Sequence, residues 1–185
     1  AMMGCKDSDA YLQASLYAYK LEPSADAAIG CAAMAFKKGD IDGSVKFFDE
    51  AISYETDNVK KAESAYKAAS VLASAKKISQ ARSYAQKAIS FNENYGAPYI
   101  LIAQLYAGNY KWNDEPALNK CTFFAAIDKL QRAKAVDPSV AEEANKLISS
   151  YSAYTPEAKD LFMLGYKAGD RITIGGWIGE TTTIR

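Results

Sequence analysis

Histidine is absent from this chain of 185 residues. Histidine is the commonest general base, the usual partner of a nucleophilic serine or cysteine, and the commonest metal ligand. The three cysteines, Cys5, Cys31 and Cys121, cannot all pair within one chain, and their spacing matches no zinc or redox motif. We therefore expect free, mostly buried thiols, no metal or other cofactor, and a protein that is not an enzyme.

Long apolar runs and an excess of charge of one sign are missing as well. No stretch approaches the roughly 18 apolar residues that a membrane-spanning helix needs. The 22 basic and 22 acidic residues cancel, which removes the global field that would draw the chain to nucleic acid or to an anionic membrane. We expect no nucleic-acid partner and no insertion into a membrane, in a globular protein of ordinary composition.

The chain does contain a recurring helix ending. A small residue near the end of a helix recurs at intervals of 33, 37 and 45 residues, at Ala18, Ala51, Ala88 and Ala133. Arrays of helical hairpins have repeats of about 34 residues. The first interval is therefore regular, and the second and third carry about three and about eleven extra residues. These extra residues fall in two expected polar connections, residues 55–61 and 108–119.

The best-formed unit covers residues 25–58. Its first helix is expected to end at Gly39, where glycine supplies the left-handed conformation of a helix end. Asp40 follows, and Ser44, Phe48 and Ala51 take the inward positions of the second helix. This pattern resembles the tetratricopeptide repeat (TPR) family. The resemblance implies an all-α fold, a right-handed superhelix of helical hairpins, which presents a binding surface rather than a catalytic pocket.

The repeat pattern predicts how the chain is divided. We expect a TPR array over residues 1–155, made of a half repeat, three full repeats and a capping helix: 5–23, 25–58, 59–94, 96–138 and 139–153. Residues 156–185 depart from the repeat. They predict a short helix from Glu157 to Lys167 and then a small β-hairpin, because β-branched and polar residues alternate around Gly175-Gly176.

The last residues carry a second resemblance. The ending Gly175-Gly-Trp-Ile-Gly-Glu-Thr-Thr-Thr-Ile-Arg185 is similar to that of bacterial TPR proteins of largely unassigned role. Precursors of such proteins often carry an export signal, so the resemblance implies a periplasmic or cell-envelope location. The location cannot be read from the N-terminus, because the chain begins midway through a repeat, which suggests a piece of a longer protein.

The TPR resemblance also implies where a partner would bind. In this family the first helix of each hairpin lines a concave groove. The expected groove residues are Phe36, Lys37, Tyr66, Ser70, Ile100 and Gln104. Most groove positions are small or apolar, so we expect a protein or peptide partner with apolar anchors, or the protein's own C-terminal tail. Alternatively, Phe36 and Tyr66 only pack against the neighbouring repeat.

A second function follows from the aromatic residues. Tyr106, Tyr110 and Trp112 gather at the insertion over residues 106–121, and aromatic rings can stack on sugar rings. With Trp177 they form a candidate site for a carbohydrate or another small ligand. Repeat cores are themselves rich in tyrosine, so most of the thirteen tyrosines are expected to be structural. Trp177 is expected either to anchor the hairpin on the last helices or to mark a docking surface.

Overall fold

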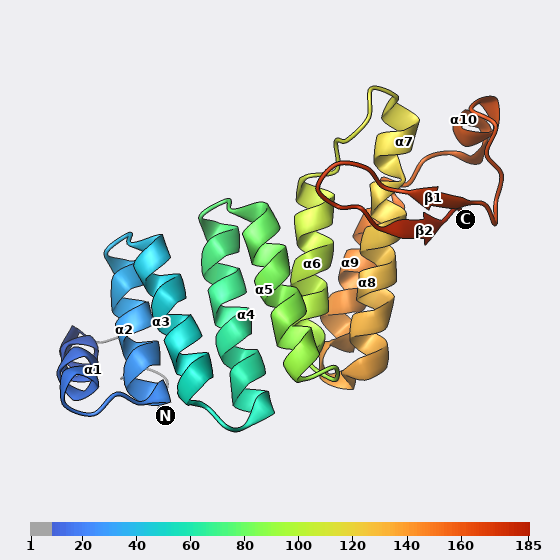
Figure 1. Ribbon diagram of the computed structural model, residues 1–185. Coiled ribbons are helices and arrows are strands. Elements are labelled where there is room, and N and C mark those ends of the chain that lie inside the picture. Colours follow the sequence, from blue (N-terminus) through green and yellow to red (C-terminus); the bar gives the residue numbers. More distant parts are fainter. Residues whose placement is uncertain (1–8) are drawn as a thin grey trace. The chain divides into compact units, whose positions relative to one another are not determined.

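The computed structural model describes residues 9–185. The chain forms two compact units, the first ending at Glu93 and the second covering Asn94–Arg185. Nearly all of the regular structure is helical, and one two-stranded antiparallel sheet lies near the C-terminus (Figure 1). The predicted all-α fold with a small C-terminal β-hairpin is therefore confirmed. No helix among the described residues is both long and apolar enough to cross a membrane.

Unit 1 is a series of antiparallel helical hairpins. Its helices are α1 (Asp9–Leu21), α2 (Ala25–Lys37), α3 (Ile41–Tyr54), α4 (Asn58–Ser74) and α5 (Ile78–Phe91). Helix α2 packs against α3, and α4 packs against α5 (Figure 1). Helix α1 packs against α2, and α3 packs against α4, so the hairpins form a continuous series. The expected polar connection over residues 55–61 is wrong in length. Helix α4 already begins at Asn58, because the Asp57 carboxylate caps it by accepting the N–H of Val59 at 2.8 Å.

The turns within the two hairpins use different residues for the same task. Gly39 ends α2 with φ of +79°, and the Asp40 carboxylate then caps α3 by accepting the N–H of Gly43 at 2.8 Å. Between α4 and α5 there is no glycine, and Lys76 adopts φ of +58° instead. A side chain in this conformation is strained by roughly 1–2 kcal/mol. The second hairpin therefore closes with a less favourable turn than the first.

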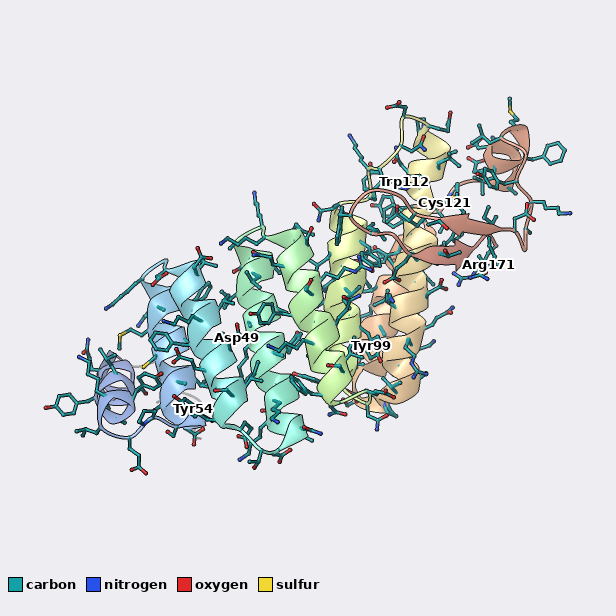
Figure 2. The ribbon with its side chains drawn as sticks, in the orientation of Figure 1. Asp49, Tyr54, Tyr99, Trp112, Cys121 and Arg171 are labelled. Atoms are coloured by element: carbon teal, nitrogen blue, oxygen red, sulfur yellow. The ribbon has the colours of Figure 1, made fainter. Side chains whose placement is uncertain are left out.

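Small residues let the helices of unit 1 approach closely. Ala32, Ala51, Ala68 and Ala88 are completely buried, and they lie where the helices cross. Phe48 fills the remaining space, with 5% of its surface exposed, among Ala32, Ala68 and Val71. A polar contact ties the third helix to the fifth, since Asp49 accepts the hydroxyl of Tyr84 at 2.5 Å and pairs with Lys87 at 2.9 Å (Figure 2).

Unit 2 contains one more hairpin, an insertion and a C-terminal module. Its elements are α6 (Gly96–Gly108), α7 (Pro116–Lys120), α8 (Thr122–Val136), the 3-10 helix η2 (Pro138–Val140), α9 (Ala141–Ser152), α10 (Ala158–Met163), β1 (Arg171–Thr173) and β2 (Thr181–Thr183). Helix α8 packs against both α6 and α9. Gly96 allows the start of α6 to approach η2, because a Cβ there would lie 2.6 Å from Val140 and 2.8 Å from Asp137.

The C-terminal module differs from its prediction in two details. Helix α10 spans only Ala158–Met163 and is followed by Gly165 at φ +85°, so the helix predicted from Glu157 to Lys167 is too long. The hairpin pairs Ile172 with Thr182, but its loop covers residues 174–180 and is longer than a Gly-Gly turn. Ile174 and Ile178 within this loop are buried. The loop is thus held by its own apolar side chains.

Polar contacts fix the hairpin to α6 and α8. The hydroxyl of Tyr106 donates to Glu180 at 2.6 Å, and Lys129 pairs with the same carboxylate at 2.8 Å. Asp128 accepts the hydroxyl of Thr182 at 2.6 Å and also pairs with Arg185. The rings of Trp177 and Tyr106 meet edge to face, with centroids 5.6 Å apart. A hairpin of this size needs such packing to be stable.

Candidate binding clefts

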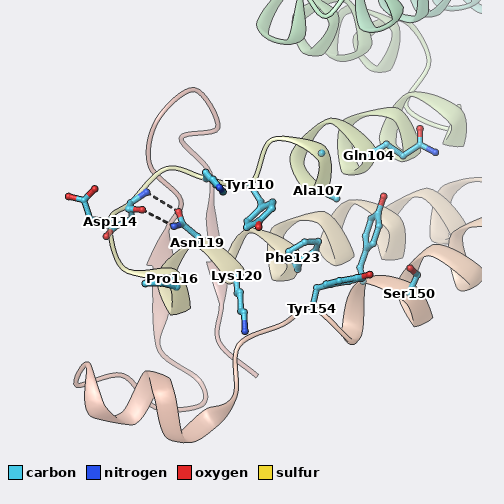
Figure 3. A pocket seen from close by; sticks show the side chains of 14 residues that line it. Gln104, Ala107, Tyr110, Asp114, Pro116, Asn119, Lys120, Phe123, Ser150 and Tyr154 are labelled. Carbon is cyan, nitrogen blue, oxygen red and sulfur yellow. Dashed lines mark hydrogen bonds between the residues drawn. The ribbon is translucent and has the colours of Figure 1, made fainter.

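Unit 2 contains a cleft of about 970 Å³ between α6, α9 and the insertion. We call it the aromatic cleft (Figure 3). It is lined by Gln104, Ala107, Gly108, Tyr110, Lys111, Asn113, Asp114, Pro116, Asn119, Lys120, Phe123, Ser150, Tyr151 and Tyr154. These residues come from the end of α6, the insertion, the start of α8, the last turn of α9 and the turn that follows it. The cleft is therefore built where the chain departs from a regular repeat.

Four aromatic side chains form one wall of the cleft. Phe123 lies at their centre, with ring centroids 5.4 Å from Tyr110, 5.9 Å from Tyr151 and 5.4 Å from Tyr154. The Phe123 and Tyr154 rings are stacked, with 25° between their planes. Phe123 is 6% exposed while Tyr154 is 57% exposed. The cluster thus has a buried base and an accessible ring that a bound group can contact.

Asn119 holds the insertion in shape. Its side-chain oxygen accepts the backbone N–H groups of Trp112 at 2.7 Å and Asn113 at 2.8 Å, and its amide nitrogen donates to the Asn113 carbonyl at 2.7 Å. The bonds to Asn113 are dashed in Figure 3. Thr122 adds a bond from its hydroxyl to the Tyr110 carbonyl at 3.2 Å. The opposite wall of the cleft is therefore formed before any ligand arrives, which lowers the entropy cost of binding.

Sequence reasoning missed Asn119, although a local signal was present. Glu115 and Pro116 mark a helix start, because Glu115 accepts the N–H of Ala117 at 3.2 Å and proline fits the first helical turn. The short helix α7 that follows carries Asn119 back over the insertion. Its 8% exposure shows that the side chain works inside the loop and not at its surface.

Charged side chains stand at the edges of the aromatic cleft. Lys111 and Lys120 are exposed, and Asp114 is the carboxylate among the lining residues. In Figure 3 the Asp114 carboxylate points outward, at the far end of the cleft from Tyr154. Glu157 lies near Lys120, but its carboxylate pairs with Lys159 at 2.9 Å, and this pair lowers the pKa of Glu157 more than Lys120 does.

A smaller hollow, of about 330 Å³, lies between α2 and α4 in unit 1. We call it the charged cleft. It is lined by Asp26, Ile29, Gly30, Ala33, Phe48, Glu55, Lys60, Glu63, Ser64 and Lys67. Lys60 lies 3.9 Å from Glu55 within it. Positive and negative side chains therefore face each other in this cleft, and no aromatic ring besides Phe48 lines it.

Comparison with known proteins supports the fold. No family model matches this chain, and no curated protein matches its sequence. Among solved structures, 23 chains match. One of these, titled "Crystal structure of MamA", is similar with a TM-score of 0.54 and 16% sequence identity, over 84% of this chain and 86% of that one. The fold is TPR-like. At such low identity the likeness concerns the fold alone.

The expected groove residues are divided between the two units. Of the six, Gln104 lines the aromatic cleft, and the other five line neither cleft. Ala107, also on α6, lies beside Gln104 in the lining. Phe36 is 43% exposed, and Lys37 beside it is exposed too. Tyr66 is partly buried and packs against a core cluster of unit 1, and its carbonyl accepts the hydroxyl of Ser70 at 3.0 Å. Ile100 must be corrected, because its side chain is only 4% exposed and offers no contact area.

The expected ligand aromatics are also divided. Tyr106 is completely buried beneath the hairpin, so it has no surface for a ligand and that expectation is corrected. Trp112 is half-buried, and the backbone at Gly175 packs against it, since a Cβ there would lie 2.7 Å from the Trp112 ring (Figure 2). Only Tyr110 lines the aromatic cleft. Tyr110 and Trp177 share a second, shallower hollow with Lys111.

The thiols are poorly suited to chemistry. Cys31 and Cys121 are free, and 2% and 0% of their surfaces are exposed. Burial raises the pKa of Cys121 to about 11 and also raises that of Cys31, so neither forms the reactive thiolate at neutral pH. Cys5 lies outside the described residues. Residues 9–185 contain no group of three or more acidic or cysteine side chains placed to hold a metal ion.

Proposed function

We propose that this protein is a non-catalytic scaffold that binds a protein or peptide segment in the aromatic cleft. The observation that carries the proposal is the cleft itself, an open hollow of about 970 Å³ with an accessible tyrosine over a buried aromatic base. A hollow lined by aromatic rings and a few converging polar groups is the usual form of a binding site. Its position in a TPR-like fold favours a polypeptide as ligand.

The walls of the cleft suit a flexible ligand. The insertion is fixed by Asn119, and the aromatic cluster is fixed by the packing of Phe123. Tyrosine side chains lose little conformational freedom when they bind, and they combine a large apolar face with a hydroxyl. An extended segment would therefore be ordered by the protein, while the protein itself would change little.

The chemistry of the cleft supports binding without catalysis. Its titratable side chains are tyrosines, lysines and one aspartate, and burial raises the pKa of Tyr151 further above its usual range. The lining residues include no histidine, which is the commonest general base. The buried cysteines lie outside the lining residues. We therefore propose binding without catalysis.

We also propose a location in the bacterial cell envelope, which rests on the resemblance of the C-terminal ending to envelope TPR proteins. Fractionation of cells that express the full gene product is the test. Recovery with periplasmic markers is expected. Recovery with cytosolic markers alone would refute this part of the proposal and leave the binding function standing.

Photo-crosslinking tests the binding function directly. A benzoylphenylalanine at Ser150, inside the aromatic cleft, is compared with one at Ser83, an exposed position on α5. We expect a discrete adduct from position 150 only, and its loss when Tyr154→Ala is added. Equal adducts from both positions, or an adduct that survives Tyr154→Ala, would show that the cleft is not the binding site.

Carbohydrate or small-ligand binding is the second candidate, and the exposure of Tyr154 favours it, because an accessible ring can stack on a sugar. Trp112 and Trp177 report on this region, so oligosaccharides can be titrated while tryptophan emission is followed. Saturable changes that Tyr154→Ala abolishes would support the glycan. The polypeptide remains the first proposal, because the amide of Asn119 is already used within the loop and is not free for sugar hydroxyls.

A further inference from the structure

Resting on the proposed function, we propose that the segment bound in the aromatic cleft is acidic. It places a bulky apolar side chain against Tyr154 and Phe123, and its carboxylates meet Lys111 and Lys120. Those two lysines come from the insertion, and not from the helix positions that TPR geometry assigns to the groove. The insertion therefore adds positive charge to a cleft whose lining residues from α6, α8 and α9 carry no charge.

The first support is the state of the two lysines. Both side chains are exposed, and within residues 9–185 neither ammonium group has an ion pair or hydrogen bond. The nearby carboxylates are Glu157, outside the lining, and Asp114, which also lines a smaller hollow together with Lys111. Glu157 pairs with Lys159 at 2.9 Å, and Asp114 points outward at the end of the cleft away from Tyr154 (Figure 3). The cleft thus keeps two cations that a ligand can neutralise.

In the charged cleft of unit 1, lysines and carboxylates of the protein itself lie together. There Lys60 and Lys67 share the lining with Asp26, Glu55 and Glu63, and Lys60 lies 3.9 Å from Glu55. An acidic segment would meet carboxylates in that cleft and be repelled. The charge balance of the two clefts therefore directs an acidic segment to unit 2.

The second support is the arrangement of the aromatic cluster. Tyr154 presents its ring beside the hollow, and its other face is stacked on Phe123. A single large apolar side chain can lie on that ring and exclude water from the neighbouring contacts. Exposed ion pairs are weak individually, so the apolar anchor supplies most of the affinity and the lysines supply specificity.

A peptide selection tests this without knowledge of the natural partner. A library of random 12-residue peptides on phage is selected in parallel on the wild-type chain, on the Lys111→Gln/Lys120→Gln double variant and on Tyr154→Ala. A fourth selection uses Lys38→Gln/Lys46→Gln, which removes the same charge from exposed positions in unit 1.

The wild type and the unit 1 control should both enrich peptides in which aspartate or glutamate lies within a few residues of a bulky apolar residue. The double variant should keep the apolar enrichment and lose the acidic one, and Tyr154→Ala should enrich neither. Enrichment of apolar but uncharged peptides on the wild type would overturn the acidic inference while supporting the proposed function. Failure of any selection to exceed background would overturn both.

Affinity measurements on one enriched peptide complete the test. Fluorescence anisotropy compares it with its Asn/Gln counterpart on the wild type. Because two exposed ion pairs are lost, we expect about threefold to tenfold weaker binding, with the difference shrinking as salt is raised. Circular dichroism of the double variant must match the wild type. Equal affinity for both peptides would overturn the inference.

Discussion

The aromatic cleft and the charged cleft both lie beside first helices of TPR-like hairpins, yet they differ in what the connections contribute. In unit 1 the connection between α3 and α4 is short and supplies Glu55, which pairs with Lys60 across the charged cleft. In unit 2 the insertion between α6 and α8 adds a wall, an aromatic residue and two lysines. In the regular hairpins of unit 1, Lys60 of the cleft pairs with Glu55, whereas Lys111 and Lys120 of the insertion have no ion pair among the described residues.

The largest expected effects test whether the stability of each unit depends equally on one buried aromatic residue. Phe48→Ala in unit 1 and Phe123→Ala in unit 2 each remove a buried ring, so each should lower the free energy of unfolding by about 3–5 kcal/mol. Both tryptophans lie in unit 2, so urea unfolding followed by tryptophan emission reports on that unit. Circular dichroism reports on both.

Phe123→Ala should shift the emission transition to lower urea, and only Phe123→Ala should weaken peptide binding. If Phe123→Ala lowers the free energy of unfolding by less than about 1 kcal/mol, packing of this ring does not support the cleft. A binding defect in a folded Phe48→Ala variant would remove the functional distinction between the units.

The insertion wall is tested by Asn119→Ala. Three hydrogen bonds to backbone groups are lost in a half-buried loop, so unfolding should become easier by about 2–3 kcal/mol. Hydrogen exchange should rise at the amides of Trp112 and Asn113 in particular. Asn145→Ala removes only an exposed acceptor for Lys134 and should change stability by less than about 0.5 kcal/mol. Unchanged exchange at both amides would contradict the assigned role.

Acid tests a contact inside unit 2, between Asp137 and the start of α6. The pKa of Asp137 is lowered, first by the Ser139 hydroxyl and also by the backbone N–H groups of Gly96 and Ser139. Because the folded-state pKa lies below that of the unfolded chain, the stabilisation is complete above about pH 4 and is lost as the pH falls through the folded-state value. In Asp137→Asn, the free energy of unfolding, followed by tryptophan emission, should fall less steeply with pH. Asp114→Asn serves as the control. Parallel acid profiles for wild type and Asp137→Asn would exclude the linkage.

The smallest effect concerns the two turns of unit 1. Lys76 has φ of +58° where the first hairpin has Gly39, so Lys76→Gly should stabilise the chain by about 0.5–1 kcal/mol. The gain is less than the relieved strain, because glycine also makes the unfolded chain more flexible. Gly39→Lys should have the opposite sign in the same urea experiment. Destabilisation by Lys76→Gly would show that the lysine side chain contributes more than its backbone costs.

The helical part of the fold was predictable from local signals. Alanines at helix crossings, Gly39 with Asp40 at a turn, and the proline after Asp137 each act within a few residues, so sequence spacing carries them. Helix ends were less predictable. Asp57 begins α4 three residues after α3 ends, and a cap of this kind can be mistaken for a polar connection.

The site was predictable only in outline. The insertion stood out as an interruption of the repeat, and Tyr110 and Gln104 do lie in the aromatic cleft. Sequence could not reveal that Gly175 packs against Trp112, or that Tyr106 is covered by the hairpin and bonded to Glu180, because those contacts join residues more than sixty positions apart. It also gave no hint of Tyr154, which lies in the turn after α9 and stacks on Phe123.

By itself the sequence determined that the chain is helical, that its helices pair in hairpins, and that residues 171–185 form a hairpin, because periodicity and turn chemistry are local properties. Only the tertiary structure decided which aromatic rings face solvent and which lysines lack a partner. Exposure depends on which distant segments cover a residue, and the C-terminal module covers Tyr106 and packs against Trp112 while leaving Tyr154, Lys111 and Lys120 open.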